Sequence, residues 1–271
     1  MRLAPIAVFA FSFCLLRPAQ EAAAQAASTS PAALPDAPAP QPSAVDRVTI
    51  RGTPLNLLRD QEALWTSPAH ARARDLQWLL PLTAAAGVAF ATDRHTMTQV
   101  VSRDPAFNQA SVDASNALIG CWIAVPVAVY GFGRARGDGH ASETGILAGE
   151  SMVDGFVVDE LLKQLFRRER PNADNGHGDF FQSNVGADSS FPSTHSVIAW
   201  SAASALAAEY PARWAQFTLY SAATGVSLTR VMGQQHFPSD VLVGSSLGWL
   251  IGHNVVKRHH HKSSELSMVQ K

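Results

Sequence analysis

Residues 191–256 read FPSTHSVIAWSAASALAAEYPARWAQFTLYSAATGVSLTRVMGQQHFPSDVLVGSSLGWLIGHNVV, a stretch in which three blocks rich in alanine, serine and leucine alternate with short breaks. The breaks contain proline and glycine, the residues that commonly end helices. Apolar and polar residues do not alternate with a period of two in this stretch, which argues against strands. The sequence therefore predicts three helices here, at 194–209, 213–232 and 239–256.

The same pattern extends toward the N-terminus, where three more blocks cover 76–92, 116–133 and 144–167. Together the six blocks predict an all-α fold, a six-helix bundle within a domain at 45–256. A domain of this length can bury one sizeable core.

Composition and block length bear on whether this bundle lies in a membrane. Charged residues make up only 16% of the chain, below the roughly 25% of an ordinary soluble domain. The apolar runs at 117–133 and 241–256 are shorter than the ~20 residues of a usual span. Small residues such as Gly244 and Gly248 suit the close helix packing of membrane bundles. Acidic residues in and beside the 144–167 block are costly in lipid unless they face the bundle interior; they are Glu143, Glu150, Asp154, Asp159 and Glu160. The balance favours a membrane-embedded bundle over a soluble one.

The two ends of the chain differ from the domain in composition. Residues 1–26 combine a basic start, Ala-x-Ala sites and an apolar run too short to cross a bilayer core of about 30 Å. They predict a cleaved export signal, with an uncleaved anchor as the alternative. Residues 27–44 predict a Pro/Ala-rich flexible linker. Residues 257–271 predict a polar C-terminal tail, in which the histidines at 259–261 offer at most a loose metal site. The formal net charge of -1 gives no reason to expect nucleic acid as a partner.

The first stretch that carries chemistry is KQLFRRERP at 163–171. Lys163 and Arg170 lie two turns apart on one face of a helix that Pro171 would end. Arginine offers a planar fork to two phosphate oxygens, and lysine adds a point charge. Basic residues at a helix end also complement the helix dipole, which is the interpretation kept for Arg167 and Arg168.

The second stretch is FPSTH at 191–195, at the start of a predicted helix. Ser193 can act as the N-cap, and the free N–H groups of a helix N-terminus bind anions. Ser193 and Thr194 add hydroxyl donors, and His195 brings a proton-transfer group that titrates near neutral pH. An ordinary cap beside a histidine is the alternative interpretation.

The third stretch is TRVMGQQHFPSD at 229–240, between two predicted helices. Arg230 ends the first helix, Asp240 begins the second, and His236 lies in the loop. A carboxylate that accepts one imidazole N–H fixes the tautomer and leaves the lone pair of the other nitrogen free to attack. We therefore expect His236 to be a nucleophile that Asp240 orients; a histidine near a helix cap is the alternative.

Together the three stretches form the pattern K-x6-RP, PS-x-H and R-x5-H-x3-D at helix ends. This pattern closely resembles the type 2 phosphatidic acid phosphatase (PAP2) and haloperoxidase superfamily, over about residues 143–252. The resemblance implies a phosphatase that hydrolyses phosphomonoester or pyrophosphate groups through a phosphohistidine at His236, with Asp240 orienting the ring and His195 protonating the leaving oxygen. It also implies a set of residues that bind the phosphoryl oxygens: Lys163, Arg170, Ser193, Thr194 and Arg230. These cations and the helix N-terminus already meet the developing charge, so no metal or other cofactor is expected.

Two positions depart from the family pattern, which usually has Gly at 194 and Ser at 229. Thr194 keeps a backbone N–H, but its side chain narrows the approach and is expected to change substrate choice. Thr229 keeps a hydroxyl, so little effect is expected there.

The expected substrate is a phosphorylated lipid or a small phosphoester, cleaved by a membrane-bound enzyme of the bacterial envelope whose site faces the periplasm. Candidate lipids are phosphatidic acid, phosphatidylglycerophosphate, undecaprenyl pyrophosphate and lipid A phosphates. A soluble periplasmic acid phosphatase of broad specificity is the alternative, favoured by the export signal and the charged 144–167 block. A vanadium-dependent haloperoxidase and a helical scaffold without activity are further alternatives.

Overall fold

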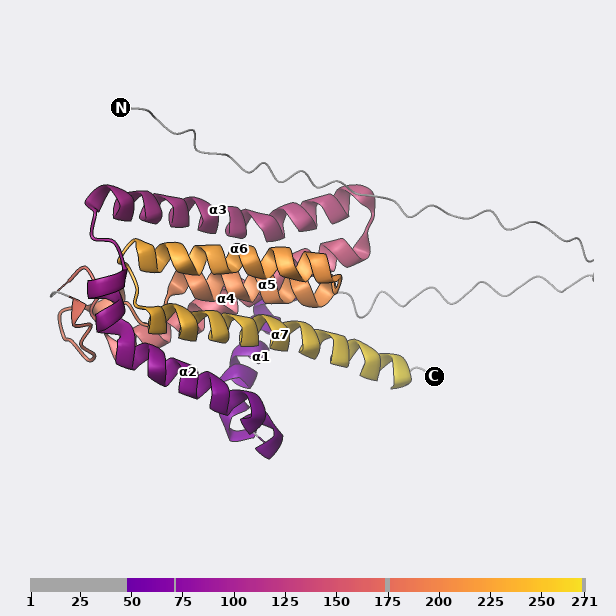
Figure 1. Ribbon diagram of the computed structural model, residues 1–271. Coiled ribbons are helices and arrows are strands. Elements are labelled where there is room, and N and C mark those ends of the chain that lie inside the picture. The colour runs from indigo at the N-terminus through magenta and orange to yellow at the C-terminus, as the bar shows by residue number, and fades with distance from the viewer. Residues whose placement is uncertain (1–47, 71, 174–175, 270–271) are drawn as a thin grey trace, which may run out of the picture. The chain divides into compact units, whose positions relative to one another are not determined.

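A computed structural model of the chain describes residues 48–70, 72–173 and 176–269. The predicted export signal at 1–26 and the predicted linker at 27–44 lie outside the described residues. Within the described residues the chain forms α-helices, a few short 3-10 or π turns and no strand, so the all-α prediction is confirmed. The helices, drawn in Figure 1, are α1 (Thr53–Thr66), α2 (Leu76–His95), α3 (Pro105–Arg136), α4 (Gly139–Phe166), α5 (Thr194–Glu209), α6 (Arg213–Met232) and α7 (Pro238–Val269).

All six predicted blocks form helices, and α1 is an additional one. The apolar pattern did not indicate α1 because its sequence, TPLNLLRDQEALWT, is largely polar and buries only Asp60. Helix α7 continues through Val269, where a separate polar tail was expected from Lys257. The helix continues because no proline or glycine follows Gly252 to end it.

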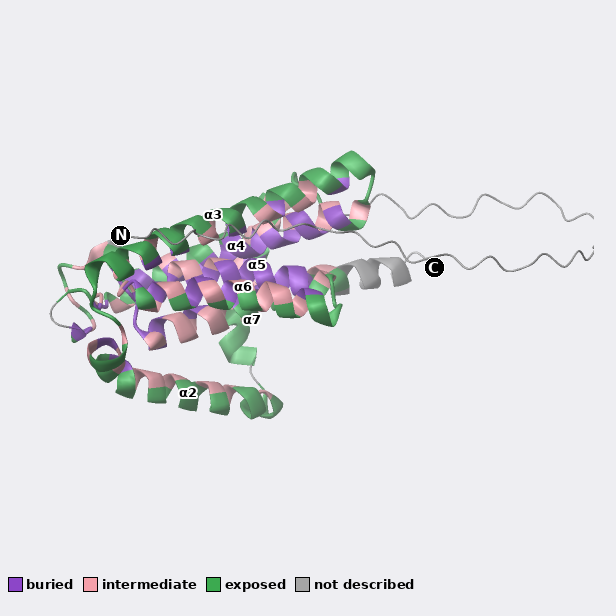
Figure 2. Cartoon of the chain, turned by 45° about the horizontal axis from the view of Figure 1, so that its top comes forward, coloured by how far each residue is buried: buried purple, intermediate pink, exposed green. Residues whose placement is uncertain are grey.

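The central helix of the bundle is α5, which packs against α4, α6 and α7 and is largely buried (Figure 2). Its contact with α7 is very close. A Cβ atom at Gly248 would lie 2.4 Å from the Val197 carbonyl oxygen, and one at Gly252 would lie 2.3 Å from the Ser201 carbonyl oxygen. Successive turns of the two helices therefore face each other in parallel, which brings both helix N-termini to the same end of the bundle.

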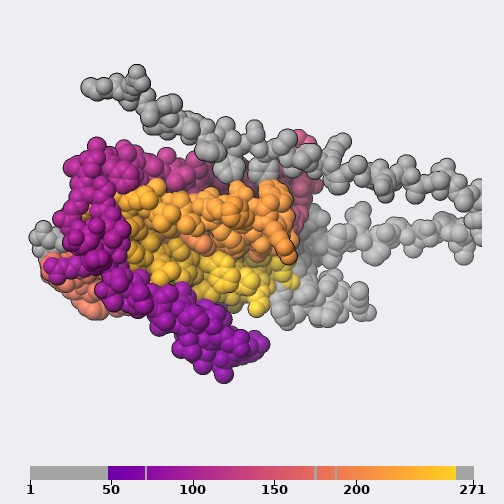
Figure 3. Space-filling view, viewed as in Figure 1, coloured from indigo at the N-terminus to yellow at the C-terminus, as the bar shows by residue number. Residues whose placement is uncertain are grey.

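The outer surface of the bundle is rich in large apolar side chains. Figure 3 shows one face, on which α6 and α7 lie side by side between α3 and α2. Among the described helices, α3 is the one long and apolar enough to cross a membrane, with a best-window mean hydropathy of 1.6 and 17% of that window buried. Helix α4 exposes a stripe of apolar residues, Val153, Phe156, Val157, Leu161 and Leu165. Three of its five acidic residues, Glu150, Asp154 and Asp159, are buried within the bundle instead.

Candidate active site

Three segments that are distant in sequence meet at one end of the bundle: the segment after α4, the start of α5, and the loop between α6 and α7 (Figure 1). Backbone hydrogen bonds join them. The Ser190 N–H donates to the Arg168 carbonyl at 2.8 Å, and the Ser193 N–H donates to the Asp240 carbonyl at 3.3 Å. The three motif stretches singled out in the sequence therefore lie together.

His236, the predicted nucleophile, lies in the α6–α7 loop with 1% of its surface exposed. Its Nδ1 atom is 2.6 Å from the carbonyl oxygen of Ser190. A carbonyl can only accept a hydrogen bond, so Nδ1 carries the proton and Nε2 keeps its lone pair. Burial holds the pKa of His236 well below its usual 6.5, and the positive charges of Arg170, Arg230 and Lys163 lower this pKa further. The ring is a neutral imidazole whose Nε2 lone pair is free.

Asp240 does not hydrogen-bond to His236 in this structure. The Asp240 Oδ2 atom is 3.9 Å from the His236 Nδ1 atom, which is beyond hydrogen-bond range. Oδ2 instead accepts the backbone N–H of Phe237 at 2.8 Å, and Oδ1 accepts Nη1 of Arg168 at 2.5 Å. The group that accepts the imidazole N–H and orients the ring is thus the Ser190 carbonyl, where Asp240 was expected. Asp240 instead organises the loop that carries His236.

Arg168 is the residue that the sequence interpretation missed. It was assigned as a solvated dipole complement, yet it is 3% exposed. Its guanidinium donates to Asp240, to Asp93 Oδ2 of α2 at 2.8 Å, and to the Gly178 carbonyl at 3.1 Å. It also lies 4.0 Å from the ring centroid of Phe237. Arg168 therefore ties α2, the loop after α4 and the start of α7 together directly behind His236.

The helix that carries Lys163 ends earlier than expected, which changes how Arg170 reaches the site. Helix α4 stops at Phe166, and Arg167 adopts a left-handed conformation with φ 43°. Lys163 and Arg170 therefore do not share a helix face. The left-handed residue redirects the chain, so that Arg168 turns inward and Arg170 approaches the site from the loop.

The three predicted phosphate-binding cations have different partners in this structure. Lys163 is 5% exposed, with Nζ 3.8 Å from Asp159 Oδ2. Arg170 pairs with the exposed carboxylate of Asp188 at 2.9 Å. Arg230 is buried and donates from Nη1 to the Ser115 hydroxyl at 3.0 Å, while its Nε has no partner among the described residues. Each cation keeps donor capacity that a phosphoryl group can use.

The N-terminus of α5 contributes the second motif. Ser193 is the N-cap residue, but its side chain makes no capping hydrogen bond. The Thr194 hydroxyl donates to Asp159 Oδ2 at 2.7 Å, so the side chain that replaces the usual glycine is held by the carboxylate beside Lys163. His195 Nε2 is 3.2 Å from Asn116 Oδ1 of α3. The first N–H groups of α5 are therefore not capped by the Ser193 side chain, and free N–H groups at a helix N-terminus can bind an anion.

Residues 145–263 match the family model of the PAP2 superfamily. The chain belongs to this superfamily. This PAP2 chain is 26% identical over 180 residues to the lipid A 1-phosphatase of Porphyromonas gingivalis, an alignment that covers 65% of the chain and 37% of that relative. The chain thus spans little more than a third of the length of the curated relative it matches. Among solved structures, it is similar to a transmembrane PAP2 type phosphatidylglycerolphosphate phosphatase from Bacillus subtilis, with 21% identity, a TM-score of 0.46, and coverage of 78% of this chain and 97% of that chain.

Proposed function

We propose that this PAP2 chain is a phosphatase in which His236 Nε2 attacks the phosphorus of a phosphomonoester or pyrophosphate. The observation that carries the proposal is the state of His236. The Ser190 carbonyl fixes the proton on Nδ1, and three nearby cations disfavour protonation of Nε2. A buried histidine that stays neutral beside positive charges suits attack on an anionic phosphoryl group, which the same cations attract.

The reaction follows from this geometry in two steps. In the first, Nε2 of His236 forms a bond to phosphorus, the bond from phosphorus to the leaving oxygen breaks, and the protonated form of His195 donates its extra proton to that oxygen. Burial and the charges of Arg230, Lys163 and Arg170 lower the pKa of His195 to about 4 in the free site, so the negative charge of the bound substrate has to favour this form. In the second, His195 takes a proton from water, the water oxygen bonds to phosphorus, and the P–N bond breaks. Inorganic phosphate leaves, and both histidines return to their starting state.

The charge that develops on the phosphoryl oxygens is met by residues from three segments. Lys163 and Arg230 are buried and already positioned, whereas Arg170 is held by Asp188 at the surface. We infer that Arg170 exchanges its exposed Asp188 partner for the substrate, because an exposed ion pair contributes little. The N–H groups of Thr194 and His195 at the start of α5 complete the cradle.

A lipid phosphate is the substrate class that the surface supports best. The apolar stripe of α4 and the exposed apolar length of α3 suit contact with acyl chains. Three of the five acidic residues of α4, Glu150, Asp154 and Asp159, are buried in the bundle and no longer argue against a membrane, whereas Glu143 and Glu160 are half-buried. We therefore propose a membrane-embedded enzyme of the bacterial envelope whose site faces the periplasm, the side to which the predicted export signal would direct the domain.

A panel of phosphorylated lipids tests the proposal. The full chain, purified in detergent, is assayed for phosphate release from lipid A 1-phosphate, phosphatidic acid, phosphatidylglycerophosphate, undecaprenyl pyrophosphate and a water-soluble phosphoester. We expect release from at least one lipid, its near-complete loss in His236→Ala, and full activity in His70→Ala, which alters an exposed histidine of the segment after α1. Absence of release from every substrate between pH 4 and 8 would overturn the proposal.

The membrane assignment has a separate test. Cell fractionation with carbonate and detergent extraction distinguishes an embedded protein from the soluble periplasmic alternative. We expect the chain to need detergent. A chain recovered in the periplasmic fraction that hydrolysed only soluble phosphoesters would support the broad-specificity acid phosphatase.

A further inference from the structure

A second cluster of ionisable side chains lies away from the phosphate site, where α1, α4 and α7 meet. Asp60, Glu150 and His259 each place one ligand atom within 4.8 Å of the other two. His259 Nε2 is 3.4 Å from Asp60 Oδ2 and 3.6 Å from Glu150 Oε2. Glu150 precedes Lys163 by about 20 Å along α4, from the helical rise per residue, so the cluster is separate from the catalytic end.

The two carboxylates of this cluster are buried with one oxygen unsatisfied. Asp60 is 3% exposed and Glu150 is 2% exposed. Asp60 Oδ2 and Glu150 Oε2, the atoms that face His259, accept no hydrogen bond from the described residues. Buried carboxylate oxygens without a hydrogen-bond donor are costly and rare, and a cation held between them and His259 would compensate them.

The other oxygen of each carboxylate is held in place by a donor. Arg258 Nε donates to Asp60 Oδ1 at 3.1 Å, and Asn56 Nδ2 donates to Glu150 Oε1 at 3.2 Å. Metal-binding carboxylates are commonly oriented in this way: a donor outside the site holds one oxygen, and the other oxygen points to the metal position. The pattern is therefore that of a prepared ligand set.

We propose that Asp60, Glu150 and His259 bind a divalent transition-metal ion, with zinc the best fit. Tetrahedral zinc with bonds of about 2.0–2.1 Å places neighbouring ligand atoms about 3.3–3.4 Å apart. The His259 separations of 3.4 and 3.6 Å match this spacing. Imidazole among carboxylates suits zinc better than calcium or magnesium, which take oxygen ligands.

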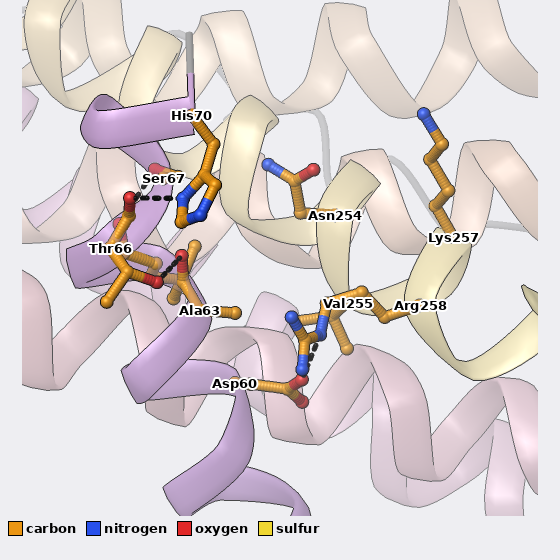
Figure 4. A pocket seen from close by; sticks show the side chains of 10 residues that line it. Asp60, Ala63, Thr66, Ser67, His70, Asn254, Val255, Lys257 and Arg258 are labelled. Carbon is orange, nitrogen blue, oxygen red and sulfur yellow. Dashed lines mark hydrogen bonds and ion pairs between the residues drawn. The ribbon is translucent and has the colours of Figure 1, made fainter. Parts of the chain in front are cut away.

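The fourth coordination position is left to water, which has a path from solvent. A cavity of about 420 Å³ between α1 and α7 reaches Asp60, as Figure 4 shows with the Arg258–Asp60 pair in its wall. Water completes the site, and the cavity gives the ion an entry route.

Such an ion would fasten α1 to the bundle. Asp60 is the one buried residue of α1, and Leu64 is its one side chain that packs, half-buried, against the hydrophobic core. A metal bridging α1, α4 and α7 neutralises the buried carboxylates and cross-links three segments. The role is structural, and the proposal stands independently of the phosphatase reaction.

Metal binding is measured on the full chain in detergent, without reference to activity. The chain is equilibrated with ZnCl2, freed of unbound metal by gel filtration, and analysed for metal by mass spectrometry. Affinity follows from competition with a chromophoric chelator, and MgCl2 serves as the comparison ion. We expect one zinc per chain, a zinc-dependent rise in Tm of about 5 °C or more, and no such response to magnesium.

Matched variants separate this cluster from the neighbouring histidines. His259→Gln, Asp60→Asn and Glu150→Gln should each weaken zinc binding at least about tenfold. His260→Gln should leave it unchanged, because His260 bonds Glu209 instead, at 2.6 Å. His259→Cys keeps a zinc ligand and should retain binding, which distinguishes a lost ligand from a lost fold. Sub-stoichiometric zinc in the wild type, or equal losses in His259→Gln and His260→Gln, would overturn the proposal.

Discussion

Replacing Arg168 by methionine should destabilise the protein more than any other single change at the catalytic end. Arg168 compensates two buried carboxylates, with contacts of 2.5 Å to Asp240 and 2.8 Å to Asp93. Both carboxylate side chains are at most 4% exposed, so solvent screens these pairs little. Methionine fills similar volume but leaves both carboxylates without a countercharge. Breaking a buried pair by removing one partner costs about 3–5 kcal/mol.

This loss of unfolding free energy should appear as a lower Tm. For a chain of this size, each kcal/mol lowers Tm by about 2–4 °C, so Arg168→Met should melt roughly 6–20 °C below the wild type. Activity should fall as well, because Asp240 and Phe237 shape the loop that positions His236. Unfolding of the purified chain in detergent, followed by circular dichroism, gives the stability, and phosphate release gives the activity.

Pairing this change with Asp93→Asn tests the electrostatic reason directly. Removing one of the two stranded charges should recover part of the loss, so the double variant should be more stable than the sum of the single effects predicts, by about 0.5–3 kcal/mol. Arg168→Lys, which keeps a charge but not the fork, should lie between the wild type and Arg168→Met. A loss below about 1 kcal/mol for Arg168→Met, or strictly additive effects in the double variant, would refute this reasoning.

Three further predictions concern the nucleophile, the helix contact and the altered motif position. Because the pKa of His236 is lowered from 6.5, its neutral form persists as pH falls. Protonation of the nucleophile should therefore cut kcat only well below pH 6.5. A pH–rate profile with an acid limb centred at 6.5 or higher would contradict this. Gly252→Ala should lower the free energy of unfolding by about 1–3 kcal/mol, since a Cβ there lies 2.3 Å from a carbonyl oxygen. Gly225→Ala should not lower it, because a Cβ at Gly225 meets nothing within 4 Å. Paired thermal melts of the two variants compare these effects. Thr194→Gly removes a 2.7 Å hydrogen bond to Asp159 and a side chain that narrows the approach; we expect a lower Tm together with broader substrate acceptance in the lipid panel, and an unchanged substrate profile would count against a selectivity role for Thr194.

The helical part of the fold could be predicted because its signals are local. Apolar blocks marked every helix from α2 to α7, and two of them, 194–209 and 213–232, have the predicted bounds. Helix α1 was missed because half of its residues are polar and its leucines do not form a continuous apolar block. The motif spacing likewise identified the loop that carries His236 and the cations around it, since these residues lie at helix ends that the same breakers define.

The tertiary structure alone decided which groups these residues contact. His236 hydrogen-bonds to the Ser190 carbonyl, 46 positions away in sequence. Asp240, which is only four positions away, accepts a hydrogen bond from Arg168 instead. Arg168 in turn bonds to Asp93, 75 positions earlier in the sequence. Asp60 of α1 contacts His259 of α7 only because the fold brings the two ends of the domain together. Helix boundaries follow from neighbours along the chain, but a hydrogen bond or an ion pair depends on a few ångströms between distant segments, and only the packing of the helices fixes those distances.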